Sequence, residues 1–267
     1  MRDQLVTDQL GRNITIPKKP LRIISLVPSQ TELLFDLGLD NELVGITKFC
    51  IHPGDKTKQK AKIGGTKALD LKKIKQLKPD LIIGNKEENE KDQIEALAKE
   101  FPVWMSDINT LGDALQMILQ IGNIVSKQEK AAEIKDKIGS SFKLLPQILN
   151  PLPRIAYFIW KNPYMVAAGN TFIDHIIHLA GWQNAISSSR YPEISPDELK
   201  KLNPDVILLS SEPYPFKEKH IREFQEICPD KPIIIANGEL FSWYGSRLQY
   251  TPSYLLQLQK QISEFKG

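Results

Sequence analysis

Two nine-residue segments of this chain repeat one another 125 positions apart, and this echo constrains the fold more than any other feature. The segments are Lys75–Ile83 and Lys200–Leu208. In each, a helical pattern stops before a proline, because the residue preceding proline avoids the helical conformation, and an apolar strand follows. The openings of the two halves also correspond, since Arg22 and Arg154 each lead a strand and then a helix. Two coincidences in the same order predict duplicated α/β lobes.

Short apolar runs alternate with helix-period segments along the chain, which is typical of βα units that build a mostly parallel sheet. The strand-length runs are Arg22–Val27, Leu43–Ile46, Asp80–Gly84, Pro102–Met105, Ile155–Ile159, Val206–Leu209 and Ile233–Ala236. The helical patterns are Thr31–Leu39, Leu71–Leu77, Asp92–Phe101, Phe172–Ala180, Pro196–Leu202 and Pro252–Phe265. We therefore predict an α/β protein of two Rossmann-like lobes with central, mostly parallel sheets.

A strand-poor segment, Leu111–Leu149, separates the two series and has the composition of a helix. Lys127–Leu145 alone would extend about 28 Å as a helix, enough to cross from one lobe to the other. Gly122 and Gly139 weaken the prediction of one unbroken helix. The predicted organisation is an N-terminal lobe at 1–110, a linking backbone helix at 111–152 and a C-terminal lobe at 153–267. The alternative is a surface helix packed on a single domain.

Composition narrows the class of protein. With 267 residues, 41% hydrophobic and 25% charged, the chain is neither disordered nor a multi-span membrane protein. A net charge of +3 gives little reason to expect a nucleic-acid partner. Cys50 and Cys228 are too few for a disulfide framework and do not identify the compartment. Because the N-terminus lacks the apolar stretch of a secretory signal, either the chain is cytoplasmic or an export signal has been removed.

The first candidate site is the strand-to-helix turn at Ser29, Gln30 and Thr31. Ser29 and Glu32 have the spacing of a capping box, and a helix start at the carboxyl end of a strand is also where α/β sheets bind polar or anionic ligand atoms. Phosphate-binding glycine motifs are absent from the sequence, which disfavours a nucleotide enzyme. His52 follows a predicted strand end and is a further candidate for ligand binding. Cys50 and His52 as ligands of a metal centre form a weaker candidate, because the sequence shows no third or fourth ligand.

The second candidate site is aromatic. Large aromatic side chains in loops at strand ends are unlike core packing and suit a cleft for a large, flat or greasy ligand. Arginines beside them would bind carboxylate, phosphate or amide oxygens, and the alternative is that some of these residues pack the interface between the lobes. The candidates are Trp160, Tyr164, Arg190, Tyr191, Phe241, Trp243, Tyr244 and Arg247.

Over essentially its whole length, the chain resembles the substrate-binding proteins of ABC importers for cobalamin, ferric siderophores and haem. The resemblance is strongest to the cobalamin-binding branch, through Ser-x-x-Pro-x-x-Thr-Glu at Ser25–Glu32 and the closing Ser246 and Arg247. It also rests on Val6–Pro17, Arg22–Leu26, Val44–Ile46 and both Leu-x-Pro-Asp echoes.

The resemblance implies a class III periplasmic binding protein, with two lobes on a rigid backbone helix and a ligand in the cleft with little hinge closure. It implies a non-enzymatic monomer without an intrinsic cofactor, located outside the cytoplasm, that delivers cobalamin, another corrinoid, haem or a ferric siderophore to a permease and its ATPase. The family's ligand contacts correspond here to Ser29–Thr31, Phe49, Tyr164 and Trp243–Arg247.

The same resemblance implies that one acidic residue on each lobe docks to the permease. The second-lobe position falls at Asp197 or Glu198, but the first-lobe position falls at Lys72, which has the opposite charge. Thr66 and Asn85 stand where the cobalamin-binding branch has tryptophan. The alternative function is a cytoplasmic corrinoid- or metal-handling protein, or an enzyme on the same scaffold, that uses Cys50 and His52. A direct zinc or manganese carrier is disfavoured by the lack of spaced histidines.

Overall fold

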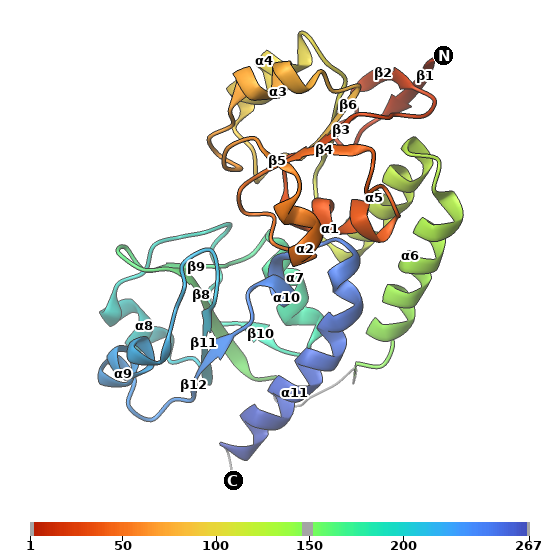
Figure 1. Cartoon of the computed structure of the whole chain (residues 1–267). Helices are drawn as coiled ribbons and strands as arrows, with labels where there is room; N and C mark the ends of the chain where they lie inside the picture. The colour runs from red at the N-terminus through yellow and green to blue at the C-terminus, as the bar shows by residue number, and fades with distance from the viewer. Residues whose placement is uncertain (1–2, 146–151, 266–267) are drawn as a thin grey trace. The chain divides into compact units, whose positions relative to one another are not determined.

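The computed structural model describes residues 3–145 and 152–265, and the chain divides into two compact units (Figure 1). Unit 1 contains Met1–Ile108, Gly112–Ile138 and Tyr244–Arg247, and unit 2 contains Asn109–Leu111, Gly139–Trp243 and Leu248–Gly267. Within the described ranges, no helix is both long and apolar enough to span a bilayer.

Unit 1 is built on a parallel five-stranded sheet with the order β5-β4-β3-β6-β7. Its strands are β3 (Ile23–Ser25), β4 (Leu43–Ile46), β5 (Ala61–Lys62), β6 (Leu81–Asn85) and β7 (Val103–Ser106), and its connecting helices are α1 (Pro28–Asp36), α2 (Gly54–Lys58), α3 (Leu71–Leu77) and α4 (Lys91–Ala98). A separate antiparallel hairpin precedes them, formed by β1 (Asp3–Thr7) and β2 (Asn13–Pro17). Every residue of β3, β6 and β7 is buried, as expected of parallel strands covered on both faces.

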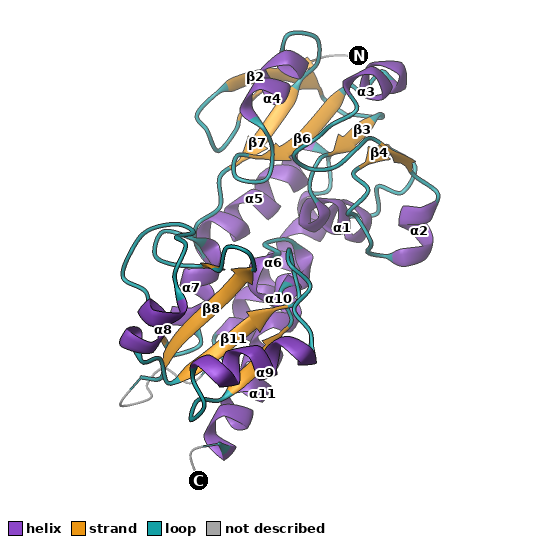
Figure 2. Cartoon of the chain, turned by 90° about the vertical axis from the view of Figure 1, so that its left-hand side faces the viewer, coloured by secondary structure: helices purple, strands orange, loops and turns teal. Residues whose placement is uncertain are grey.

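Unit 2 repeats this plan with the strand order β10-β8-β11-β12, and a short strand, β9, pairs antiparallel with β8. The central strands β8 and β11 lie side by side (Figure 2). The strands are β8 (Arg154–Trp160), β9 (Met165–Val166), β10 (Gln183–Asn184), β11 (Val206–Ser210) and β12 (Ile233–Ala236). The helices are α7 (Phe172–Leu179), α8 (Pro196–Leu202), α9 (Glu218–Ile227), α10 (Glu239–Ser242) and α11 (Thr251–Glu264), with a 3-10 turn, η1 (Ser246–Tyr250), before the last.

Side chains of the central strand β8 alternate between two cores in unit 2. Phe158 packs edge-on against Phe224 of α9, with ring centroids 4.6 Å apart. Its neighbour Tyr157 packs at 4.7 Å against Phe241 of α10. Successive strand residues point to opposite faces of a sheet, so α9 and α10 cover different faces.

The echo in the sequence corresponds to a repeated hydrogen-bonded clamp, which begins with Arg22 in unit 1. The Arg22 guanidinium donates to the carbonyl oxygens of Leu77, at 2.9 Å, and Lys78, at 3.2 Å, where α3 ends. Lys78 takes the left-handed conformation, with φ of 46°, which stops the helix. Asp80 then accepts from the Arg22 amide at 2.9 Å, so the clamp joins the starts of β3 and β6.

Unit 2 contains the same clamp. Arg154 donates to the carbonyl oxygens of Leu202 (2.9 Å) and Asn203 (3.3 Å), and Asn203 stops α8 with φ of 45°. Asp205 accepts from the Arg154 amide at 2.8 Å. Equal geometry at both copies of a repeated sequence confirms the predicted duplication of the α/β plan.

The segment after β7 contains two helices, α5 (Leu111–Ile124) and α6 (Gln128–Phe142), rather than one. The break falls at Ser126, whose φ is 56°, and not at either glycine. Gly122 instead allows close approach, because a Cβ built there would overlap the Ala131 side chain. Residues 146–151 of the expected linking segment lie outside the described residues. The predicted domain boundaries, between residues 110 and 111 and between residues 152 and 153, stay a prediction.

The clamp makes a testable prediction about stability. Asp80→Asn replaces one of two carboxylate acceptors with an N–H donor facing the Leu21 and Arg22 amides, and should lower the free energy of unfolding in urea by about 1–2 kcal/mol. The matched control is Asp230→Asn, which also follows a proline but is exposed and accepts no hydrogen bond from the described residues. Equal stability of the two variants would contradict the role of the clamp.

Candidate functional site

Ligands of open α/β sheets bind at the carboxyl ends of the strands. In unit 1, the first turn of α1 follows β3, the loop Thr47–His52 follows β4, and Asn85 ends β6. In unit 2, Trp160 ends β8 and the loop from Ser211 to Lys217 follows β11. These segments contain six of the thirteen residues predicted to bind a ligand: Ser29, Gln30, Thr31, Phe49, His52 and Trp160.

Helix α1 begins at Pro28, three residues before the predicted helical pattern at Thr31–Leu39 and two before the start that a Ser29 cap would give. Val27 is its N-cap, Pro28 occupies the first position, and no side chain caps the helix. The predicted capping box of Ser29 with Glu32 is therefore wrong, because proline favours the first helical position and places Ser29 inside the turn. The Ser29 hydroxyl is buried, and no described residue forms a hydrogen bond with it. The first-turn amides likewise have no intrahelical acceptors, so this helix start retains donors for a polar atom.

The two residues after Ser29 belong to buried polar networks. The Gln30 amide donates to the Ser106 hydroxyl at 2.7 Å, and the Asn85 amide donates to the same oxygen at 3.0 Å. The Thr31 hydroxyl lies 2.9 Å from the Val27 carbonyl oxygen, to which it donates, and 3.1 Å from the Cys50 sulfur. Gln30 and Thr31 thus order the loops around the carboxyl edge of the sheet, and their contact with a ligand stays a prediction.

The segment Tyr244–Arg247 belongs to unit 1, where it lies against α1. Arg247 forms a bidentate ion pair with Glu32, at 2.8 and 2.6 Å, and Ser246 donates to Asp36. Gly245 passes so close to Ser29 that a Cβ would overlap the Ser29 carbonyl oxygen. Burial raises the pKa of Glu32, while the hydrogen bond and charge of Arg247 oppose that rise. The guanidinium predicted to bind a ligand is therefore engaged with a carboxylate of the protein, and a ligand contact for it stays a prediction.

Phe49 is the exposed aromatic residue of unit 1 at this edge. Its side chain follows β4 and is 52% exposed, beside Ile51 at 53%. The ring packs against the backbone at Gly65, and the Lys48 ammonium lies 5.1 Å from its centroid. The half-buried His52 completes this loop. Phe49 therefore presents an exposed apolar surface, and the packing of its ring at Gly65 fixes its position.

Cys50 and His52 do not form a metal centre with other described residues. Among those residues, no group of three or more histidine, cysteine, aspartate or glutamate side chains is placed to hold a metal ion. Burial raises the pKa of the Cys50 thiol, whereas a metal ligand must be a thiolate. The metal-handling alternative gains no support from this geometry.

In unit 2 the aromatic surface at this edge is a pair, the exposed Trp160 and the half-buried Tyr214. Trp160 is 40% exposed at the end of β8, and its ring meets the Tyr214 ring edge-on, with centroids 5.7 Å apart. Tyr164, predicted from the sequence, instead turns toward the core, with centroids 5.9 Å from Phe158 and 5.0 Å from Phe224. Sequence reasoning missed Tyr214, although its position just after β11 parallels that of Trp160 after β8.

The closing aromatics are more buried than expected. Phe241 is fully buried inside α10, so the expectation that loop aromatics lie outside the core is wrong for this residue. It is wrong because a short helix, unrecognised in the sequence, turns the side chain onto Tyr157. Trp243 and Tyr244 are also buried, and the Trp243 indole donates to Glu212 at 2.8 Å. Ligand contact by these three aromatic residues stays a prediction.

Arg190 and Tyr191 lie in an exposed loop of unit 2. The Arg190 guanidinium lies 5.6 Å from the centroid of the Tyr191 ring and donates to the Asn170 carbonyl oxygen at 3.0 Å. Arg190 itself has φ of 66°, a conformation uncommon for a residue with a Cβ. Their contact with a ligand also stays a prediction.

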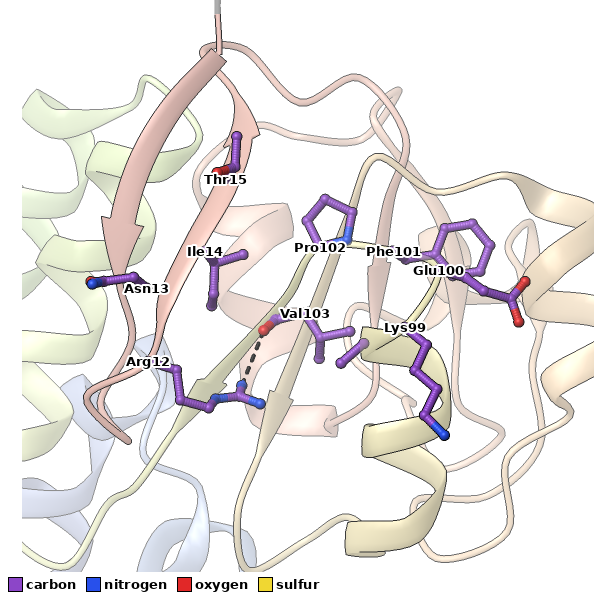
Figure 3. Close-up of a pocket in the computed structure, with 10 residues that line it drawn as sticks. Arg12, Asn13, Ile14, Thr15, Lys99, Glu100, Phe101, Pro102 and Val103 are labelled. Atoms are coloured by element: carbon purple, nitrogen blue, oxygen red, sulfur yellow. Dashed lines mark hydrogen bonds between the residues drawn. The ribbon is translucent and has the colours of Figure 1, made fainter.

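A pocket in unit 1 opens beside the edge strand β7 (Figure 3), and none of the residues that line it is a predicted ligand contact. It lies between β2 and the segment from Ala98 to Val103. Arg12 spans its floor, where it donates to the Val103 carbonyl oxygen at 3.1 Å and pairs with Asp8 at 2.6 Å. Both interactions hold the Arg12 side chain against the edge strand β7, where it satisfies a backbone carbonyl oxygen.

The chain matches the sequence profile of a family described as periplasmic binding protein over residues 23–226. It belongs to the periplasmic binding protein family. A vitamin B12-binding protein of Pectobacterium atrosepticum is 25% identical over 258 residues, which cover 92% of this chain and 90% of that protein.

Two solved structures share the fold of this periplasmic binding protein. A periplasmic heme-binding protein from Pseudomonas aeruginosa matches with a TM-score of 0.74 at 21% identity, covering 88% of this chain and 91% of that one. The molybdate-binding protein MolA of Haemophilus influenzae matches with a TM-score of 0.80 at 16% identity, covering 98% of this chain and 93% of that one.

The acidic residues expected to dock this periplasmic binding protein to a permease lie in the first turn of α8. Here Ser195 and Glu198 form the capping box: the Ser195 amide donates to the Glu198 carboxylate at 2.7 Å, and the Glu198 amide donates to the Ser195 hydroxyl at 3.2 Å. These bonds lower the pKa of Glu198. Asp197 is exposed beside it, and Lys72 is exposed in the corresponding turn of α3.

The ion pair between Arg247 and Glu32 should make the stability cost of removing Arg247 depend on pH. Arg247→Met leaves Glu32 buried without its counter-charge, and should cost about 2–4 kcal/mol of unfolding free energy at pH 7.5. Its removal raises the already elevated pKa of Glu32 further, so the folded variant takes up a proton on acidification and the loss should shrink at pH 5. Urea unfolding at both pH values measures this. Arg190→Met is the exposed control, and an equal loss at both pH values would argue against the pair.

Proposed function

We propose that this chain is the substrate-binding component of an ABC importer, which works outside the cytoplasm as a monomer. It would deliver a small molecule to a permease and its ATPase, without an intrinsic cofactor and without catalysis. Membership of the periplasmic binding protein family supports this role, because that family consists of substrate-binding transport proteins. The vitamin B12-binding relative covers nearly the whole chain, which supports the same kind of cargo protein.

We infer that the cargo is large, with a flat or apolar face, as in a corrinoid, a haem or a ferric siderophore. The observation that carries this inference is the exposure of aromatic side chains at the carboxyl edges of both sheets. Phe49 in unit 1 and Trp160 in unit 2 are both exposed, although Phe49 packs at Gly65 and Trp160 packs against the half-buried ring of Tyr214. Rigid aromatic surfaces with few polar groups nearby are characteristic of sites for such ligands.

The start of α1 would supply the polar complement to these aromatic surfaces. Its buried Ser29 hydroxyl and first-turn amides are donors, which suits a cargo that presents amide, carboxylate or hydroxamate oxygens. We propose Ser29 as the polar contact, with Gln30 and Thr31 holding the turn in place. Access to it requires movement of the Tyr244–Arg247 segment, since Gly245 lies on the Ser29 backbone.

Titration of the purified protein with cyanocobalamin, dicyanocobinamide, hemin and ferrichrome, followed by intrinsic tryptophan fluorescence and calorimetry, tests the cargo class. We expect saturable 1:1 binding of at least one of these compounds. No response to any of them would reject this class of cargo. Stoichiometric zinc or iron in protein purified without chelator, lost in Cys50→Ala, would instead favour the metal-handling function.

Removal of either aromatic surface should weaken binding. Phe49→Ala and Trp160→Ala are each expected to raise the Kd for the bound compound about tenfold, because each deletes a stacking surface. Phe265→Ala is the matched control, since this phenylalanine is 59% exposed but lies after α11, far along the chain from any strand end. A Kd unchanged in both test variants would place the cargo elsewhere.

Asp197, rather than Glu198, is the acidic residue we propose for docking to the permease. The Glu198 carboxylate is held by the capping box, whereas Asp197 is exposed on the same turn. Asp197→Lys should therefore reduce stimulation of the transporter's ATPase in proteoliposomes while cargo affinity stays unchanged. Glu198→Gln serves as the control for the helix start. Equal stimulation by Asp197→Lys and wild type would contradict this assignment.

A further inference from the structure

His220 contacts Tyr214, the half-buried member of the aromatic pair of unit 2. It is the third residue of α9 and is only 2% exposed. Its ring meets the Tyr214 ring edge-on at 5.5 Å, and its Nε2 atom lies 3.3 Å from the Tyr214 hydroxyl oxygen. Tyr214 in turn contacts Trp160. The imidazole of His220 is thus linked through Tyr214 to Trp160, which belongs to the surface proposed to bind the cargo.

The hydrogen bonds of His220 define its protonation state in this arrangement. The Lys217 amide donates to Nδ1 at 2.8 Å, so Nδ1 must be unprotonated. A neutral imidazole then carries its proton on Nε2, which can donate to the Tyr214 hydroxyl. One ring nitrogen therefore holds the start of α9, and the other holds the loop that positions Tyr214.

We propose that His220 is a positioning residue that holds Tyr214 against Trp160 only while its imidazole is neutral, so that cargo binding weakens on acidification. This inference rests on the proposed function, because it assigns a control to the same aromatic surface. Protonation at Nδ1 would place an N–H against the Lys217 N–H, which loses its acceptor. The start of α9 and the loop before it would then separate from the imidazole, and Tyr214 would lose its fixed orientation.

The surroundings of His220 favour the neutral form. Burial lowers its pKa below the ordinary value of 6.5, and the positive charge of Lys161 acts in the same direction. The titratable and charged groups that face it are Lys161 at the end of β8, Tyr214 and Lys217 from the loop, and Lys219 and Glu223 from α9. Glu223 opposes the shift, but it is paired with Lys161. Because the folded-state pKa is lowered, the positioning is complete above pH 6.5 and is lost as the pH falls through the folded pKa.

The ligand-free protein gives the first test, which does not depend on any cargo. Tryptophan fluorescence titrated from pH 8 to pH 4.5 should show a transition with a midpoint below 6.5 that disappears in Trp160→Phe and in H220Q. Glutamine can accept from the Lys217 amide and donate to Tyr214 without titrating. His178→Gln is the matched control, because His178 is exposed on α7 and contacts no aromatic residue of the pair. A transition that persists unchanged in H220Q would overturn the proposal.

Cargo binding gives the second test. The Kd for cyanocobalamin should rise about five- to tenfold from pH 7.5 to pH 5.0 in the wild type, as expected for loss of one hydrogen bond, and less than twofold in H220Q. The same pH dependence in both proteins would overturn the proposal. If cyanocobalamin, dicyanocobinamide, hemin and ferrichrome all fail to bind, the proposed function fails, while the ligand-free titration still decides the role of His220. If H220Q does not fold, H220N replaces it, because its side-chain oxygen can also accept from the Lys217 amide without titrating, and a full-sized transition in that variant counts against the inference.

Discussion

A guanidinium group that binds the last carbonyl oxygens of a helix fixes the amino edge of each sheet. Arg22 and Arg154 both do this, and an aspartate two residues beyond the helix stop closes the clamp from the other side. The clamp also fixes strand register, because the next residues along pair directly: Ile23 with Leu81, and Ile155 with Val206. With the amino edge held in this way, the carboxyl edge is left for loops that need not stabilise the sheet.

Those carboxyl-edge loops combine buried polar order with exposed aromatic surface. In unit 1, Ser106 receives hydrogen bonds from Gln30 and Asn85, and these bonds fix loops from three strands around one hydroxyl group. In unit 2, Glu212 accepts a hydrogen bond from the Trp243 indole, and His220 forms a hydrogen bond with the Tyr214 hydroxyl. Aromatic side chains held in this way lose little conformational entropy when a ligand covers them, which favours binding. Gln30, which was predicted as a ligand contact, therefore orders the loops beside the surfaces that we propose to make contact.

Local sequence predicted seven of the twelve strands in the described residues, most of the helices and the duplication, because apolar runs and proline positions are local signals. Ser-x-x-Glu occurs at Ser29 and at Ser195, but only Ser195 precedes its proline and so becomes the N-cap. Attention to that proline would have separated the two. Tyr214 and His220 were missed as site residues, and Phe241 was misplaced, because their positions depend on packing between distant elements. The β1–β2 hairpin was missed because its strands are half-exposed and lack a long apolar run.

The assignment of Tyr244–Arg247 to unit 1 has a consequence for how the chain can be divided. These four residues lie between α10 and α11, which belong to unit 2, yet Arg247 neutralises Glu32 in the first helix of unit 1. A fragment that ends before residue 244 would therefore leave a buried carboxylate without its counter-ion and the Ser29 backbone uncovered. The two halves arose on the same plan, but no single cut in the sequence yields both of them intact.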